Sequence, residues 1–239
     1  MPINSALLRQ TTRENVTLWG VLTAVQCLLV GVIGMTAPIA AAGIAYYNML
    51  PGIFMGVYAI TVGNKLISSQ VDRGTLAYVL SNPVKRSTVI VTQVVFFAGS
   101  LLAMCTLSAV AHSLGAYFST FGANSAEIQT IFKLNLGLFT LALSFAGIVF
   151  AASCLFNLSK YTIAVGGGIV CAFLLFPIMA MFGSKFAFLS NLTVVSLYKV
   201  GSIMASGTGW AWDLVILAAI GLVAFAAGGV AFVRRDLPL

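Results

Sequence analysis

Residues able to do chemistry are few in this chain and lie far apart. Its 239 residues include five acids, one histidine and four cysteines. His112 has no second histidine with which to hold a metal ion. Cys27, Cys105, Cys154 and Cys171 stand singly inside apolar runs, without the CxxC spacing of a metal or redox site. The acids Glu14, Asp72, Glu127, Asp213 and Asp236 all fall at the ends of apolar runs or between them. The sequence therefore predicts neither a catalytic centre nor a metal site.

Nucleotide chemistry is not predicted either. The chain contains no GxxxxGK[ST] loop, whose backbone would cradle the phosphates of ATP. We therefore expect the chain not to be an enzyme by itself and to hold no cofactor. Any nucleotide chemistry would have to come from another chain.

The composition is that of an integral membrane protein. The chain is 60% hydrophobic and 7% charged, with a mean hydropathy of +1.06, whereas a soluble domain carries about 25% charged residues. Its apolar runs are continuous rather than alternating, which favours helices over a barrel. The net charge of +7 comes from basic residues scattered singly at the ends of these runs. That pattern is typical of topology determinants and contacts with anionic lipid, and it argues against nucleic-acid binding.

The predicted fold class is all-α, with six transmembrane helices in a single domain over residues 1–239. Residues 1–15 form an amphipathic segment suited to an interfacial helix. The run after it resembles a signal peptide, but we expect a retained first span. Residues 183–212 are too polar for a clean span and too apolar for a free loop, which predicts a short interfacial or re-entrant helix. The predicted spans are residues 17–36, 50–67, 88–117, 132–156, 161–182 and 213–233.

Basic residues predict the orientation. With both termini inside, nine of the twelve Lys/Arg lie on the inner side, and only Lys133, Lys185 and Lys199 lie outside. This is a clear positive-inside bias, which places the loop of residues 68–87 in the cytoplasm. Tyr46 and Tyr47, in the first outer loop, are expected at headgroup depth.

The loop of residues 68–87 is the one strongly polar interruption between apolar runs. Helix-forming residues predominate from Val71 to Leu80, and Pro83 ends that helix because the residue before proline is pushed out of the α region. Lys85 and Arg86 then anchor the chain at the headgroups. Two interpretations remain: a helix lying on lipid, or a stiff knob that docks a soluble partner.

The run from Ile67 to Ser87, ISSQVDRGTLAYVLSNPVKRS, resembles the "E-x-[ED]-x-GTL-x-x-LLS-x-P-[VI]-x-R" signature of ABC-2-type permeases. Those are the six-span membrane subunits of bacterial ABC exporters. The C-terminal FVRRDL, Phe232 to Leu237, is similar to the usual ending of such permeases. Gln70 departs from the pattern, because the family commonly has Glu there. The matching positions are Asp72, Gly74, Thr75, Leu76, Leu80, Ser81, Pro83, Val84 and Arg86.

The resemblance implies that this loop is a coupling helix, which inserts into a groove of a cytoplasmic P-loop ATPase that binds ATP and Mg²⁺. It also implies a bacterial cell-membrane protein and a dimer of permeases with two ATPases. The turn at Asn157 and Lys160 would offer a second, smaller contact. The implied ATPase-coupling residues are Gln70, Asp72, Arg73, Gly74, Thr75, Leu76, Leu80, Ser81, Pro83, Arg86, Asn157 and Lys160.

The expected substrate is hydrophobic or amphipathic, such as a drug, a lipid or a hydrophobic peptide, because no fixed charge lies in the middle of a span. Gly52, Gly56 and Gly63 share one helix face, which permits close helix contact. His112 is a candidate either for hydrogen bonding between helices or for a proton relay or ligand contact. The candidate substrate path or subunit interface comprises Thr23, Gln26, Gly52, Gly56 and Thr61.

Two other functions are compatible with a polytopic chain. A stand-alone channel or secondary carrier would work without an ATPase. A membrane-embedded lipid-modifying enzyme would need acids or histidines clustered at one membrane face, and the sequence has no such cluster.

Overall fold

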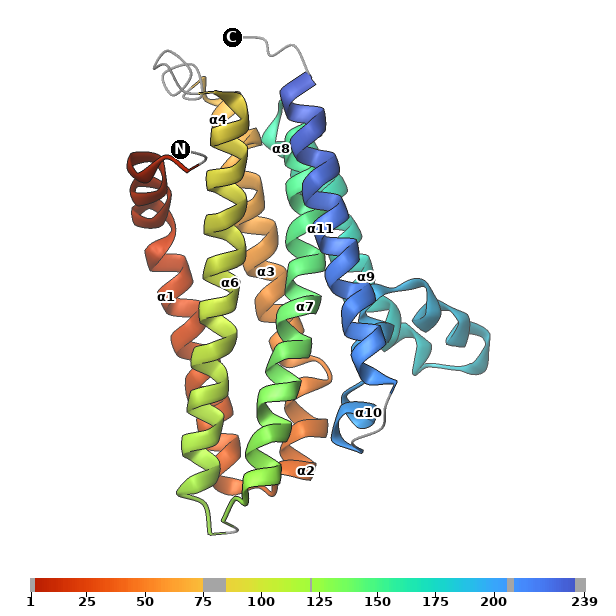
Figure 1. Ribbon diagram of the computed structural model, residues 1–239. Helices are drawn as coiled ribbons and strands as arrows, with labels where there is room; N and C mark the ends of the chain where they lie inside the picture. The colour runs from red at the N-terminus through yellow and green to blue at the C-terminus, as the bar shows by residue number, and fades with distance from the viewer. Residues whose placement is uncertain (1–2, 75–84, 121, 206–208, 235–239) are drawn as a thin grey trace.

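The computed structural model describes residues 3–74, 85–120, 122–205 and 209–234, and all regular secondary structure in them is helical. The longer helices run side by side as one bundle (Figure 1). α1 begins and α11 ends at the same end of this bundle. The longer helices are α1 (Ser5–Thr36), α3 (Leu50–Leu66), α6 (Arg86–Tyr117), α7 (Ser125–Leu155), α9 (Gly168–Ala180) and α11 (Trp210–Arg234).

Shorter helical segments connect them. α2 (Ile39–Ala42) and the π-helix η1 (Gly43–Tyr47) lead into α3, and α4 (Ser68–Asp72) follows it. α8 (Ser159–Thr162) and the π-helix η2 (Ile163–Gly167) continue into α9. Two 3-10 helices, η3 (Ser184–Leu192) and η4 (Val194–Leu197), and α10 (Val200–Met204) lie between α9 and α11.

The multi-pass character predicted from the sequence is confirmed. Five helices of the described chain are long and apolar enough to cross a bilayer. α3, the predicted second span, has 17 residues, or about 26 Å at about 1.5 Å per residue, a little less than the roughly 30 Å hydrocarbon core. That α3 crosses the membrane stays a prediction. The five helices are Ser5–Thr36, Arg86–Tyr117, Ser125–Leu155, Ser159–Ala180 and Trp210–Arg234.

The N-terminal segment differs from the prediction. Residues 5–36 form one continuous helix of 32 residues rather than an interfacial helix followed by a span. Asn4 caps it by accepting hydrogen bonds from the amides of Ala6 and Leu7. Thr11 and Asn15 donate to carbonyls one turn earlier, so both side-chain donors are bonded without a break in the helix.

α7 also begins earlier than the predicted residue 132. Asn124 accepts a hydrogen bond from the Glu127 amide at 2.9 Å, and the Glu127 carboxylate accepts one from the Asn124 amide at 3.0 Å. This reciprocal capping box satisfies two amides of the first turn and starts the helix at Ser125.

The segment between α9 and α11 is a broken helical excursion, where the sequence predicted one short helix. Lys185–Leu192 and Val194–Met204 meet at an angle of 78° and together are long and apolar enough for a broken span or a re-entrant loop. In Figure 1 the first part projects from the side of the bundle.

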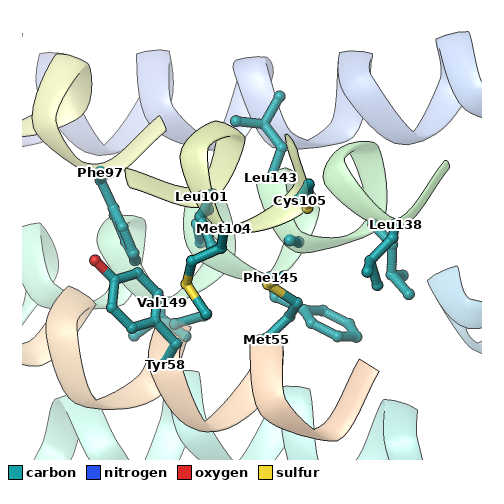
Figure 2. Packing of buried hydrophobic residues seen from close by; sticks show 14 of the residues in the cluster. Met55, Tyr58, Phe97, Leu101, Met104, Cys105, Leu138, Leu143, Phe145 and Val149 are labelled. Carbon is teal, nitrogen blue, oxygen red and sulfur yellow. The ribbon is translucent and has the colours of Figure 1, made fainter. Parts of the chain in front are cut away.

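α7 lies at the centre of the bundle and is the most buried of the five apolar helices, with 78% of its most apolar window covered by protein. Figure 2 shows side chains of α3 and α6 pointing toward one another beside α7. This packing forms the larger hydrophobic core. The labelled residues are Met55 and Tyr58 of α3, Phe97, Leu101, Met104 and Cys105 of α6, and Leu138, Leu143, Phe145 and Val149 of α7.

A very close helix crossing joins α7 to α11. A Cβ atom added to Gly147 would collide with the backbone carbonyl oxygen of Gly221. One added to Gly221 would lie 2.7 Å from the carbonyl oxygen of Leu143. Ser144 Oγ donates a 2.7 Å hydrogen bond to the Leu217 carbonyl oxygen within the same crossing. Small residues at this crossing therefore bring the two backbones into direct contact.

We expect Gly221→Val to lower the free energy of unfolding by about 1–3 kcal/mol, because the added side chain must push two backbones apart. Unfolding in detergent, followed by tryptophan fluorescence, measures the change. Gly20→Val is the matched control, since nothing lies within 4 Å of a Cβ at Gly20. Equal losses in both variants would contradict the close crossing.

Candidate functional site

The end of the bundle that carries α4 and α8 contains a network of short polar contacts, here called the α4–α8 junction (Asn64, Ser68, Asp72, Ser153 and Ser159). Asn64, in the last turn of α3, donates from Nδ2 to Ser159 Oγ at 2.7 Å. Ser159 Oγ donates in return to Asn64 Oδ1 at 2.9 Å. This reciprocal pair joins the end of α3 to the start of α8.

Asp72 and Ser68 attach α4 to the same place. The Ser159 amide donates to Asp72 Oδ2 at 3.2 Å, so a carboxylate from α4 caps the first turn of α8, where negative charge is favourable. The Ser68 amide donates to Ser153 Oγ of α7 at 2.9 Å. α4 is therefore fixed at both of its ends to neighbouring helices.

The predicted ATPase-coupling residues fall on or near this junction where the structure describes them. Gln70 and Asp72 lie on α4, and Arg73 and Gly74 follow it. Gly74 has a φ of +69°, the left-handed conformation in which glycine commonly ends a helix. Arg86 begins α6, while Asn157 and Lys160 flank the start of α8. Thr75, Leu76, Leu80, Ser81 and Pro83 lie outside the described residues.

Basic side chains gather at the junction's end of the bundle. At the opposite end, Lys199 forms a 3.0 Å ion pair with Asp213, and Lys133 Nζ lies 5.7 Å from the ring centre of Trp210. The described Lys and Arg residues at the junction's end are Arg9, Arg13, Lys65, Arg73, Lys85, Arg86, Lys160 and Arg234.

A second polar group, here called the Tyr47 cluster (Gln26, Tyr46, Tyr47, Ser108, His112 and Asn135), is buried toward the other end of α3. Asn135 Nδ2 donates to the Tyr47 hydroxyl at 2.7 Å, and that hydroxyl lies 3.0 Å from His112 Nδ1. The hydroxyl accepts from Asn135, and the tautomer of His112 decides which partner donates in the contact with Nδ1. One hydroxyl thus joins η1, α6 and α7.

Several atoms of the Tyr47 cluster lack a hydrogen-bond partner among the described residues although they are buried. Polar atoms buried in this way need a ligand or water to offset the loss of solvation. The cluster therefore has free hydrogen-bonding capacity inside the bundle. The unpaired atoms are Gln26 Oε1 and Nε2, Ser108 Oγ, His112 Nε2 and Asn135 Oδ1.

An open pocket of about 410 Å³ lies beyond the Tyr47 cluster, between the end of α1 and the α6–α7 connection. Its lining includes the polar residues Ser119, Asn124 and Glu127. Gly34 also lines it, and a Cβ atom there would lie 2.9 Å from His112 Cδ2. Gly34 therefore stands between the pocket and the His112 ring.

Tyr46 and Tyr47 lie inside the protein, and their depth in the membrane stays a prediction. Their side chains are 0% and 1% exposed, so neither ring faces lipid. The predicted outer loop folds into α2 and the π-helix η1, which bring both rings into the core. Of the two roles considered for His112, the structure contains the hydrogen bond between helices.

The candidate path residues have separate surroundings. Gly52 and Gly56 are buried, and Cβ atoms there would meet Leu174 of α9 at 3.6 and 2.9 Å. Their small size thus serves packing within one chain, so the predicted contact of these glycines with a second subunit is not needed to explain them. Thr23 bonds to the Trp19 carbonyl oxygen one turn earlier. A path role for Thr23, Gln26 and the half-buried Thr61 stays a prediction.

Sequence reasoning did not identify Asn64, Ser159 and Asn135 as site residues. A polar residue within an apolar run could have indicated these sites, because such residues in a membrane usually face protein. Asn64 and Asn135 both fit that description. Their partners lie 95 and 88 residues away in the chain, so the pairing itself is a result of the fold.

A comparison with known families agrees with a multi-pass membrane fold. The family model described as ABC-2 family transporter protein matches residues 32–237. The chain therefore belongs to the ABC-2 transporter family. Within an ABC transporter it is the membrane permease, a component that works with an ABC ATPase. No curated protein sequence matches the chain.

We expect the Asn64–Ser159 pair to show a coupling energy of about 0.5–1.5 kcal/mol in a double-mutant cycle of Asn64→Ala and Ser159→Ala. Chemical unfolding in detergent provides the four free energies. Asn64→Ala combined with Ser113→Ala is the control, because Ser113 bonds only to the Ala109 carbonyl of its own helix. Additive effects in the Asn64–Ser159 cycle would contradict the reciprocal bond.

We expect Tyr47→Phe to lower the free energy of unfolding by about 1–3 kcal/mol, because it leaves His112 Nδ1 and Asn135 Nδ2 without the shared hydroxyl. Thermal unfolding in detergent measures the effect. Tyr117→Phe is the control, since Tyr117 is 70% exposed, and it should change stability by less than about 0.5 kcal/mol. Similar behaviour of the two variants would argue against the cluster.

Proposed function

We propose that this chain is the permease subunit of an ABC exporter and that residues 68–87 dock into a cytoplasmic P-loop ATPase. The α4–α8 junction is the observation that supports the proposal most directly. Asp72 and Ser159 tie the proposed docking segment to the turn at Asn157–Lys160. The described start of one ATPase contact that the family resemblance implies is thus bonded to the other.

The junction supports a way of passing force from the ATPase into the membrane. A push on α4 reaches α8 through Asp72, and the end of α3 is bonded to the same Ser159. A floppy loop would dissipate that motion, whereas a segment fixed at both ends transmits it. The ATPase then shifts the permease between conformations by binding one of them more tightly when its own subunits close.

α3 connects the two polar groups. Its C-terminal end carries Asn64 and its N-terminal end follows directly on η1, which holds Tyr47. In our proposal a displacement at the junction reaches the Tyr47 cluster along this one helix. The cluster's bonds between η1, α6 and α7 would break and re-form as the bundle opens and closes on the side away from the ATPase.

The charge distribution supports the orientation. Eight described basic residues lie at the junction's end, and an excess of Lys and Arg marks the cytoplasmic side of a membrane protein. We propose that both termini and the junction face the cytoplasm of a bacterial cell. The ATPase would bind ATP and Mg²⁺, and this chain would hold no cofactor.

We further propose a dimer of permeases that moves a hydrophobic or amphipathic substrate outward, of the class of drugs, lipids or hydrophobic peptides. Among the described residues the spans contain aromatic, methionine and hydroxyl side chains, and three of the four acids, Asp72, Glu127 and Asp213, lie near helix ends. Such a lining offers apolar contact and a few hydrogen bonds, which suits an amphipathic molecule better than an ion.

We expect Arg73→Glu to reduce co-purification of the ATPase and its stimulation in proteoliposomes at least tenfold. Arg73 is exposed beside Asp72, so reversing its charge changes the docking surface without disturbing the core. Gly74→Val should act in the same direction, because a β-branched residue strains the left-handed backbone. The assay is pull-down from membranes, mass spectrometry of the bound protein and ATP hydrolysis.

Arg9→Glu is the matched control for Arg73→Glu, because Arg9 is also exposed and basic but lies on α1. It should leave ATPase binding unchanged. Thermal unfolding midpoints equal to that of the wild type show that the variants fold. Substrate transport by the purified chain alone, in liposomes without ATP, would overturn the proposal in favour of a channel or secondary carrier.

A further inference from the structure

A long apolar groove runs between the first half of α6 and the last third of α11. Its volume is about 500 Å³, and nearly all of its wall is apolar. It is a separate place from both the α4–α8 junction and the Tyr47 cluster. The lining residues are Ser87, Ile90, Val91, Val94, Val95, Phe225, Ala226, Gly229, Val230, Val233 and Arg234.

The length of the groove matches one leaflet of a bilayer. It extends along α6 from Ser87 to Val95 and along α11 from Phe225 to Arg234. At about 1.5 Å per residue these stretches measure roughly 12 and 14 Å. Half of a hydrocarbon core of about 30 Å is about 15 Å. The groove thus extends from the membrane surface to near the bilayer midplane, as a single acyl chain does.

Gly229 keeps the groove open. A Cβ atom at this position would lie 3.0 Å from Ile90 Cγ2 of the opposite wall, so any larger residue would fill the space between α6 and α11. Val91 and Val230, on the two sides, are 38% and 51% exposed. The described chain places no other element over these side chains.

Positive charge is concentrated at one end of the groove only. Arg234 lines that end, and Lys85 precedes the first turn of α6 beside Ser87. Both side chains are exposed, and neither pairs with an acid in the described part of the chain. The start of α6 adds the positive end of a 32-residue helix dipole. This end therefore suits a phosphate group.

We propose that the groove binds an anionic phospholipid, with one acyl chain between α6 and α11 and its phosphate beside Arg234 and Lys85. The apolar wall, the one-leaflet length and the cationic end together match this ligand. A second copy of the chain fits less well, because a two-fold contact on this face would bring like charges from both copies together. The proposal does not depend on the identity of the ATPase or of the transported substrate.

Native mass spectrometry of the purified permease tests the proposal. The protein is titrated in detergent with phosphatidylglycerol or with phosphatidylcholine of the same acyl chains. The wild type should bind phosphatidylglycerol the more tightly. Arg234→Gln should lower that preference about fivefold, since one basic residue near a membrane surface contributes about 1 kcal/mol. Arg9→Gln, which removes a charge away from the groove, should not lower it.

Filling the groove tests its apolar part. Gly229→Leu should reduce binding of both lipids at least tenfold, and Val91→Trp should do the same from the α6 wall. Gly20→Leu is the control, because it adds the same side chain to α1 where nothing lies within 4 Å. The unfolding midpoint of each variant shows whether it folds. If Gly229→Leu does not fold, Val91→Trp still tests the groove.

Two results would overturn the proposal. Unchanged phosphatidylglycerol binding in both groove-filling variants would show that the lipid binds elsewhere. A change from dimer to monomer in those variants, with lipid binding preserved, would assign the groove to a contact between two copies of the chain.

Discussion

The contact between the backbones of α7 and α11 is the constraint on which the rest of the structure depends. Lipid is as apolar as a leucine side chain, so helices in a bilayer gain little by burying apolar surface against one another. They associate by close fit, and Gly147 and Gly221 provide it by removing two side chains from the crossing. α11 covers one side of α7, and α3 and α6 cover its other sides. α7 is therefore buried along most of its length, and α3 and α6 pack against it.

Around this apolar centre, hydrogen-bonded groups hold both ends of α3. At one end of α3 the reciprocal Asn64–Ser159 pair joins distant parts of the chain, and near the other end the Tyr47 hydroxyl does the same. Each bond is directional, whereas the apolar packing between them is not. The polar groups therefore determine how α3 is aligned along its axis, and the apolar residues determine only how close it lies. Midway along α3 the Tyr58 hydroxyl also donates to Ser100 Oγ of α6 at 2.8 Å, so the helix is aligned along its whole length and is suited to moving as a unit.

The sequence predicted the parts of this fold that follow from composition and local pattern. Apolar length indicated the membrane helices, scattered basic residues indicated a charged end, and the run from Ile67 to Ser87 indicated the family. It did not predict that α1 is continuous, because charged residues such as Arg9, Arg13 and Glu14 beside leucines give the same amphipathic pattern whether or not the helix runs on into the span. It did not predict that Tyr46 and Tyr47 are buried, because a π-helix has no recognisable pattern. The junction was missed for a related reason, since Asn64 and Ser159 acquire their meaning only through a partner 95 residues away.

The length of α11 relates this protein to the thickness of its membrane. It begins at Trp210 and ends at Arg234, 25 residues or about 37 Å at about 1.5 Å each, which exceeds the hydrocarbon core but not the roughly 40–45 Å that includes both headgroup layers. An exposed tryptophan, Trp212, and the terminal Arg234 thus fall in opposite headgroup layers. A thinner bilayer would force α11 to lean over. Because the backbone of α11 touches that of α7, a change in the tilt of α11 would also tilt α7. The conformation of the bundle would then depend on membrane thickness.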